Sequence, residues 1–222
     1  MTEASRSVKV NRRKVEFMPQ LASRQSTPQR HAPMVILALI FLISLVIEIG
    51  RGFGEGTLIL VGVFLATFVP LIMERLARVA IPLHLQVLYG LLLLSGGYIG
   101  SYLHFYGVWY PWDTVVHFYS GFVIALAAHF ALRVITERYR FTLPGWVHGV
   151  ILTSIGVTGA FLWEVGEFVR DLLVGGDAQV DNQDTMTDMI AGTIAALIVA
   201  VLISQRPSQR MVHKEELAHN SR

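Results

Sequence analysis

Six long, mostly apolar stretches limit this chain to folds that exist inside a membrane. A transmembrane helix needs roughly 20 such residues to cross a hydrocarbon core of about 30 Å. With 53% hydrophobic and 15% charged residues, the 222-residue chain is also too apolar for a soluble domain. None of the stretches alternates strictly, and backbone groups in lipid must pair within the chain, so the sequence predicts an all-α, polytopic helix bundle. The predicted spans are residues 33–49, 57–73, 83–101, 115–135, 146–169 and 185–203.

Basic residues concentrate on one side of this predicted bundle. Lys and Arg in short loops stay on the cytoplasmic side of a membrane. With the N-terminus inside, all but two of the 18 basic residues, Arg51 and Arg170, fall on the cytoplasmic side. The sequence therefore predicts that both termini are cytoplasmic.

The two ends of the chain differ in composition from the apolar middle. Residues 1–32 are polar and basic, which predicts a disordered cytoplasmic tail, and residues 204–222 predict a second one around the six-helix domain at 33–203. Because the basic excess lies in tails and loops, we expect the lipid bilayer and no nucleic acid as a partner, and the sequence names no protein partner. The absence of cysteine excludes disulfides, thiolate metal sites and cysteine nucleophiles.

Three carboxylates interrupt the end of the fifth span. Glu164, Glu167 and Asp171 are spaced three and four residues apart, so they lie within about 60° of one another around a helix. A charged side chain facing lipid near the bilayer centre costs at least about 2.5–3.5 kcal/mol. This stripe must therefore face protein or water.

The fourth and sixth spans begin with similar polar patterns 71 residues apart, which suggests an internal repeat. In both, an Asp-Thr pair is followed by a polar residue and then by a glycine on the same helix face. The matching positions are Asp113, Thr114, His117 and Gly121 in the fourth span and Asp184, Thr185, Asp188 and Gly192 in the sixth.

Small residues at helix faces allow close packing in lipid, and the fifth span offers Gly156 and Ala160 for this purpose. We therefore expect the polar faces of the last three spans to meet in one cluster near the outer surface. The predicted members are Asp113, His117, Glu164, Glu167, Asp184 and Asp188, with Arg170, Asp171 and Asp181 at the rim.

So many acidic groups cannot all be charged at close range without a counter-charge. A divalent metal ion such as Zn, Mn or Mg could bind them, protons could be shared, or Arg170 and Arg51 could neutralise part of the charge. In an enzymatic interpretation Glu164 and Glu167 are the catalytic candidates. In a metal interpretation the ligands are His117, Asp113, Glu164, Asp184 and Asp188.

Simpler roles compete with this interpretation. Asp113 and Asp184 each stand where a helix begins, so each could be an N-cap. Glu167 could belong to a solvated helix end. His129 and His148, towards the other end of their spans, are expected to be interfacial or paired within the bundle.

Three motifs resemble the YjdF-type bacterial inner-membrane proteins and, more distantly, the VanZ-like proteins. They are "WDTVVHFYSGF" at 112–122, "WEVGEF" at 163–168 and "DNQDTMTDM" at 181–189. The resemblance covers roughly residues 105–200. It implies a multi-pass protein of the bacterial cytoplasmic (inner) membrane, and the family carries no established reaction.

Three functions fit these features. The first is a metal-assisted or acid/base site that faces outward and acts on a lipid-linked or other envelope substrate. The second is a proton- or cation-coupled transporter, and the third is a noncatalytic scaffold in which the polar cluster only ties helices together.

Overall fold

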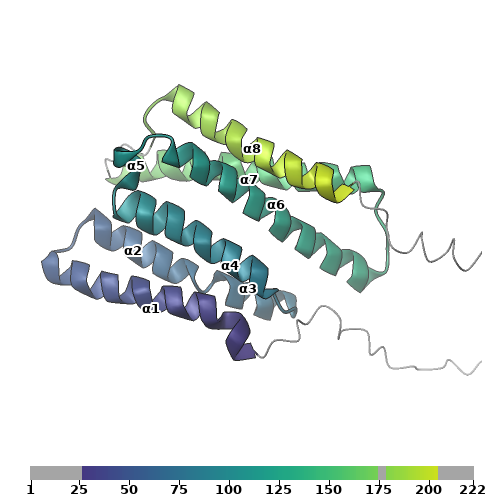
Figure 1. Ribbon diagram of the computed structural model, residues 1–222, viewed down its shortest axis with the longest axis horizontal. Coiled ribbons are helices and arrows are strands. Elements are labelled where there is room, and N and C mark those ends of the chain that lie inside the picture. The colour runs from purple at the N-terminus through teal and green to yellow at the C-terminus, as the bar shows by residue number, and fades with distance from the viewer. Residues whose placement is uncertain (1–26, 175–178, 205–222) are drawn as a thin grey trace, which may run out of the picture.

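The computed structural model describes residues 27–174 and 179–204, which form helices joined by short connections (Figure 1). These two ranges contain no strand, and six helical segments are long and apolar enough to cross a membrane. The predicted all-α membrane fold is therefore confirmed. The elements are α1 (Thr27–Arg51), α2 (Glu55–Ala66), α3 (Val69–Ala77), α4 (Leu83–Leu92), η1 (Leu93–Tyr102), α5 (Phe105–Val108), α6 (Trp112–Tyr139), α7 (Gly145–Val174) and α8 (Asn182–Ser204).

The helices are longer than the apolar stretches that predicted them. Helix α1 begins at Thr27, so the boundary of the predicted tail at residue 32 is wrong by several residues. The remainder of that tail, and residues 205–222 of the other, lie outside the described residues. Polar residues can extend a helix past the hydrocarbon core because its backbone groups pair within the helix itself.

The second span is broken between α2 and α3, which the apolar pattern does not reveal. Pro70 lies in the first turn of α3 and has no N–H to donate to the Ala66 carbonyl four residues earlier. The Tyr89 hydroxyl of α4 donates a hydrogen bond to that carbonyl at 3.0 Å. A neighbouring helix therefore satisfies the group that the proline leaves unpaired.

The third span changes from the α-helix α4 to the π-helix η1, which places the connection to α6. The Trp112 indole N–H, at the start of α6, donates to the Ser95 carbonyl of η1 at 3.1 Å. The Tyr106 ring of α5 occupies the space beside Gly100, where any side chain would collide with it. These contacts fix α5 and the first turn of α6 against the third span.

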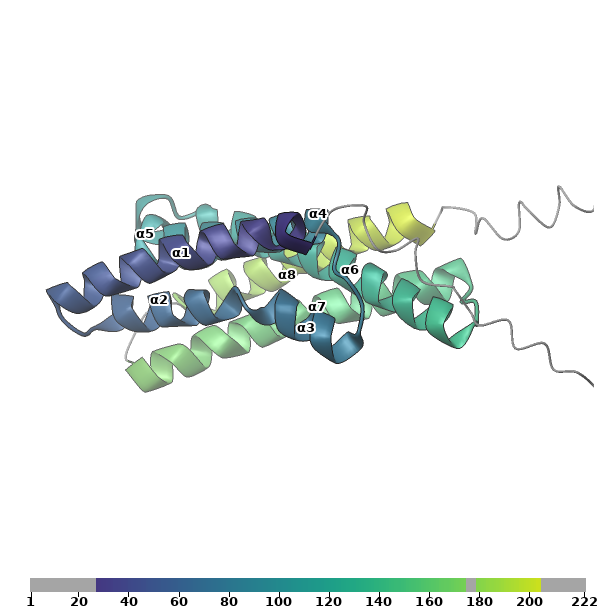
Figure 2. The same ribbon diagram turned by 90° about the horizontal axis from the view of Figure 1, so that it is seen from below.

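The last three spans form a tightly packed unit at one edge of the bundle. Helices α1 and α2 lie side by side at the other edge, with α4 between (Figure 1). Helices α6 and α8 begin near α5, where the antiparallel α7 ends; this is called the α5 end below (Figures 1 and 2). A Cβ at Gly121 of α6 would overlap the Gly192 carbonyl of α8, and one at Gly156 of α7 would overlap the Ala196 side chain.

Beyond these glycines, the interior of the unit is apolar. Six buried side chains from α6, α7 and α8 form one hydrophobic cluster, and none carries a polar atom. Charged groups within this unit are therefore confined to its ends. The cluster consists of Ala125, Ala128, Leu152, Ala196, Val199 and Ala200.

The contact between α6 and α8 predicts a sharp difference between two glycine substitutions. Gly121→Ala would drive a methyl group into the Gly192 backbone, whereas Gly166→Ala on α7 meets no atom within 4 Å. Overpacking typically costs about 1–3 kcal/mol, and replacing an unconstrained helical glycine gains up to about 1 kcal/mol. Thermal unfolding in detergent should show a lower Tm for Gly121→Ala and an equal or higher Tm for Gly166→Ala. Equal Tm values for the two variants would contradict the close contact.

Candidate functional site

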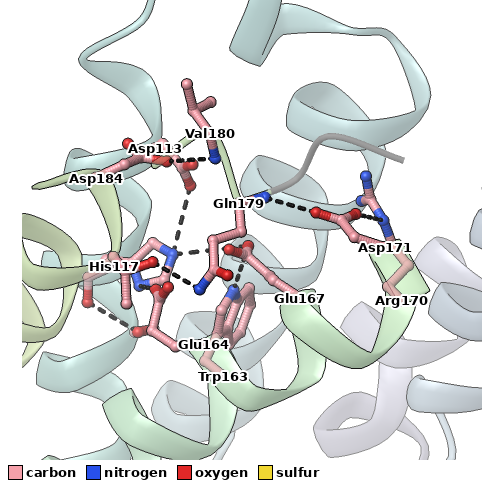
Figure 3. A network of polar contacts seen from close by, with 12 residues as sticks. Asp113, His117, Trp163, Glu164, Glu167, Arg170, Asp171, Gln179, Val180 and Asp184 are labelled. Carbon is pink, nitrogen blue, oxygen red and sulfur yellow. Dashed lines mark hydrogen bonds and ion pairs between the residues drawn. The ribbon is translucent and has the colours of Figure 1, made fainter. Parts of the chain in front are cut away.

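His117 lies at the centre of the polar cluster at the α5 end (Figure 3). Only 1% of its side chain is exposed. Its Nε2 atom is 3.4 Å from Asp113 Oδ1, one turn earlier on α6, and its Nδ1 atom is 3.5 Å from Glu164 Oε1 of α7. The imidazole therefore lies between two carboxylates from different helices.

Glu167 approaches the same edge of the imidazole as Asp113. Its Oε1 atom is 3.9 Å from His117 Nε2 and accepts a hydrogen bond of 3.1 Å from the Trp163 indole N–H (Figure 3). The Trp163 ring packs edge-on against the imidazole, with ring centroids 5.5 Å apart. Trp163 therefore orients both the carboxylate and the imidazole.

Asp188 brings α8 into the cluster and is only 1% exposed. One ligand atom each from Asp113, His117 and Asp188 lies within 4.8 Å of the other two, as does one each from His117, Glu164 and Glu167. The Thr114 hydroxyl hydrogen-bonds to Asp188. The predicted meeting of the three polar faces is thus present, with His117 common to both groups.

Several polar atoms of the cluster are buried and have no hydrogen-bond partner within residues 27–174 and 179–204. A buried polar atom without a partner costs roughly 1–3 kcal/mol, and a charged one costs more. Such an arrangement calls for a ligand or a proton that satisfies these atoms. The unpaired atoms are Asp113 Oδ1, His117 Nδ1 and Nε2, Glu164 Oε1 and Asp188 Oδ1.

Asp184 lies beside the cluster but serves another purpose. It accepts hydrogen bonds from the Tyr110 hydroxyl at 2.9 Å and from the Val180 backbone N–H at 3.3 Å. Asp181 caps α8, because its carboxylate accepts from the Asp184 backbone N–H at 2.9 Å. The N-cap interpretation is therefore wrong for Asp184. It is also wrong for Asp113, which follows the first residue of α6 and caps nothing.

The rim residues connect the cluster to the rest of the protein. Arg170 pairs with Glu55 of α2 at 3.6 Å and with Asp171 at 3.5 Å. Asp171 also accepts from the Gln179 backbone N–H at 2.9 Å (Figure 3). Arg170 is thus engaged at the rim, and no Lys or Arg of the described residues forms an ion pair with the carboxylates that contact His117.

Comparison with known proteins supports the interpretation of this fold. A family model described as "Predicted membrane protein (DUF2238)" matches residues 32–208. The chain belongs to this family. YjdF-type proteins form the same family, so that resemblance is confirmed, while the more distant resemblance to VanZ-like proteins stays a prediction.

Among curated proteins, an "Uncharacterized protein" of Thermotoga maritima is 29% identical over 150 residues, which cover 66% of this chain and 76% of the relative. No solved structure matches the chain. The comparisons therefore establish a multi-pass membrane protein family, and the chemistry has to be argued from the site itself.

The sequence did not single out four residues that shape the site: Trp163, Gln179, Tyr106 and Tyr110. The hydrogen bond to Asp184 raises the pKa of Tyr110, and burial, followed by the nearby Asp113 carboxylate, raises the pKa of Tyr106. Both phenols are therefore neutral at neutral pH, and Tyr110 donates its proton to the hydrogen bond with Asp184. The cluster of aromatic residues at 102–112 was the available signal, but it also fits a membrane interface.

The other histidine pair lies at the opposite end of the bundle. His129 Nδ1 and His148 Nε2 are 2.9 Å apart, so of the two alternatives left by the sequence, interfacial or paired within the bundle, the structure shows that these histidines pair with each other. Within α6, twelve residues, or about 18 Å at 1.5 Å per residue, separate His129 from His117. This pair is therefore separate from the cluster.

Because several carboxylates lie close together, their repulsion should lower the stability of the folded protein when no cation is bound. The Asp188→Asn substitution removes one buried carboxylate charge, so it should increase the free energy of unfolding of the metal-free protein by about 1 kcal/mol or more. Its Tm should rise accordingly. Glu137→Gln, at an exposed pair with Arg133, should change it little. Thermal unfolding in the presence of a chelator measures both. A lower Tm for Asp188→Asn would instead indicate that the carboxylate ties the helices together.

Proposed function

We propose that the His117 cluster binds a divalent cation and uses it, with Glu167 as general base, on an amphiphilic substrate of the bacterial envelope. The proposal is carried by one observation. A fully buried imidazole, whose two nitrogens have no hydrogen-bond partner in the described part of the chain, is surrounded by carboxylates from three helices.

The donor atoms fit a small cation. Ligands about 2.0–2.2 Å from a tetrahedral metal are about 3.3–3.6 Å apart. His117 Nε2 is 3.4 Å from Asp113 Oδ1, and one donor atom each of Asp113, His117 and Asp188 lies within 4.8 Å of the other two, so small side-chain movements would bring these three to a common ion. Glu167, whose Oε1 lies 3.9 Å from His117 Nε2, is left beside this group to act as the base. One imidazole and several carboxylates suit Zn or Mn, and Mg less well.

Charge balance supports the same conclusion. Asp113, Glu164, Glu167 and Asp188 surround a single imidazole in a region that excludes most water. Like charges at this range destabilise one another, and a divalent cation offsets two of them directly. Arg170 cannot replace it, because its guanidinium is paired with Glu55 and Asp171.

Accessibility gives the residues different roles. The side chains of Asp113 and Glu167 are 15% and 18% exposed, whereas Glu164 is 5% exposed and His117 1%. A substrate therefore reaches the cluster from the side of Asp113 and Glu167. A bound cation supplies Lewis acidity or an activated water there. Glu167, oriented by Trp163, is placed to accept a proton from a nucleophile on that side.

The position of the cluster supports an amphiphilic substrate. Asp188 lies six residues into α8, about 9 Å from its start, and Asp113 lies in the first turn of α6. This depth matches the region between headgroups and hydrocarbon. Val108, Trp109 and Tyr110, exposed beside the entrance, offer an apolar surface at the same level. A lipid-linked headgroup would meet both features, and the charge bias of the sequence favours an orientation in which this end faces outward from the bacterial cytoplasmic membrane.

Transport is less well supported by the geometry. The break at Pro70 and the π-helix η1 are irregular segments of the kind that transporters use. However, in the α6, α7 and α8 unit a buried apolar cluster that includes Ala125 and Ala128 lies between the His117 cluster and His129. A site confined to one end fits chemistry at a surface better than passage across the membrane.

The proposal predicts a stoichiometric metal in the purified protein. Mass spectrometry of the detergent-solubilised wild type, loaded with Zn or Mn and then dialysed, should find about one ion per chain. His117→Ala and Asp113→Asn remove a donor and should each lower binding at least 100-fold, while His84→Ala, at an exposed residue of α4, should retain it. Retention of the metal by His117→Ala would contradict the proposal, provided that the variants insert into membranes normally.

The proposed orientation has its own test, because the chain contains no cysteine. We expect Val108→Cys, at an exposed position of α5, to react with a membrane-impermeant maleimide in intact bacterial cells. Ser5→Cys and Ser221→Cys should react only after the cells are opened. Labelling of the terminal positions in intact cells would reverse the predicted topology.

A further inference from the structure

We propose that Glu164 is a positioning residue that holds the proton on His117 Nδ1 and thereby directs Nε2 to the cation. This inference rests on the proposed cation site and changes the role expected for Glu164, which the sequence placed among the ligands. It follows from the different surroundings of the two edges of the imidazole ring.

The Nε2 edge is the open one. It faces two carboxylates, those of Asp113 and Glu167, which are more exposed than the third carboxylate beside the ring, that of Glu164. The Nδ1 edge faces Glu164, which is buried. A cation that enters from outside meets the Nε2 edge first, and the Asp113 carboxylate is already placed there to share it.

Glu164 is held by a chain of hydrogen bonds whose direction is fixed by its first member. The Gln179 side-chain amide can only donate through Nε2, and it donates to Thr185 Oγ1 at 2.7 Å. The Thr185 hydroxyl also hydrogen-bonds to Glu164. Since Thr185 accepts from Gln179, its own proton is directed at the Glu164 carboxylate. One oxygen of Glu164 is thus occupied, while Oε1 remains aimed at His117 Nδ1.

This arrangement selects one form of the histidine. A carboxylate accepts hydrogen bonds and donates none, so Glu164 favours an N–H at Nδ1. A neutral imidazole with its proton at Nδ1 presents a lone pair at Nε2, where the cation binds. Carboxylates that orient metal-binding histidines in this way typically contribute 10–100-fold to metal affinity without touching the metal.

The first measurement identifies the coordinating nitrogen. In protein labelled with ¹⁵N-histidine and loaded with ¹¹³Cd²⁺ as a probe for zinc, the His117 signal is assigned by its loss in His117→Ala. We expect ¹¹³Cd coupling at Nε2 and a retained proton at Nδ1. Coupling at Nδ1 would overturn the inference and leave the cation site itself intact.

The second measurement separates a positioning residue from a ligand. Zn²⁺ affinity, measured by competition with a chelator, should fall 10–100-fold in Glu164→Gln and by at least 100-fold in Asp113→Asn. Thr185→Val should weaken binding in the same direction but less than Glu164→Gln. Thr187→Val, at an exposed position of α8, should leave the affinity unchanged.

The possible results distinguish the two proposals. Loss of Zn²⁺ from Glu164→Gln as complete as that from Asp113→Asn would make Glu164 a ligand and overturn the inference alone. The same affinity in Glu164→Gln as in the wild type would also overturn it. A wild-type protein that binds neither Zn²⁺ nor Cd²⁺ would overturn the proposed function, and the positioning role with it.

Discussion

The close contact between the backbones of α6 and α8 at Gly121 and Gly192 is the constraint on which the site depends. Apolar association provides little force between helices that are already in lipid, so these helices are held by close packing over small residues. One turn before the contact, each helix carries a polar residue, His117 on α6 and Asp188 on α8. A wider crossing would separate these two side chains and leave each facing lipid or a void.

The two helices that meet there carry the similar patterns noted in the sequence, and equivalent positions lie against each other. Gly121 contacts Gly192, and His117 and Asp188 belong to one group of potential ligands. The first Asp of each pattern, Asp113 on α6 and Asp184 on α8, differs between the two helices in its surroundings. Asp113 keeps an unpaired oxygen beside the imidazole, whereas Asp184 is occupied by Tyr110 and Val180. The connection before each helix therefore decides which carboxylate remains free.

These contrasts show which parts of the molecule were predictable. Helical periodicity placed Glu164 and Glu167 on one face, and a charged side chain within a membrane span has to face protein or water. The polar cluster could therefore be predicted from the sequence, as could the six spans from the length of the apolar stretches. The break at Pro70 was not predicted, because the apolar residues around it suit a continuous helix and a broken one equally well. The proline itself was a signal for the break. Contacts such as Trp163 with Glu167 and Gln179 with Thr185 depend on side-chain directions and on the path of a loop, and residue spacing does not encode either.

The energetics of the cluster bear on whether it serves only to hold the helices together. Replacing a buried group of charges by apolar side chains of similar volume is often neutral or stabilising, and the apolar interior around Leu152 shows that these three helices pack well without charge. Cohesion alone would thus be supplied more effectively by extending that interior to the α5 end. The cluster instead leaves five buried polar atoms of four residues without a hydrogen-bond partner in the described part of the chain, and its most exposed carboxylates, those of Asp113 and Glu167, lie on one side. Such a cost is expected where a site awaits a ligand, because the free energy lost in the empty protein is recovered when the ligand binds.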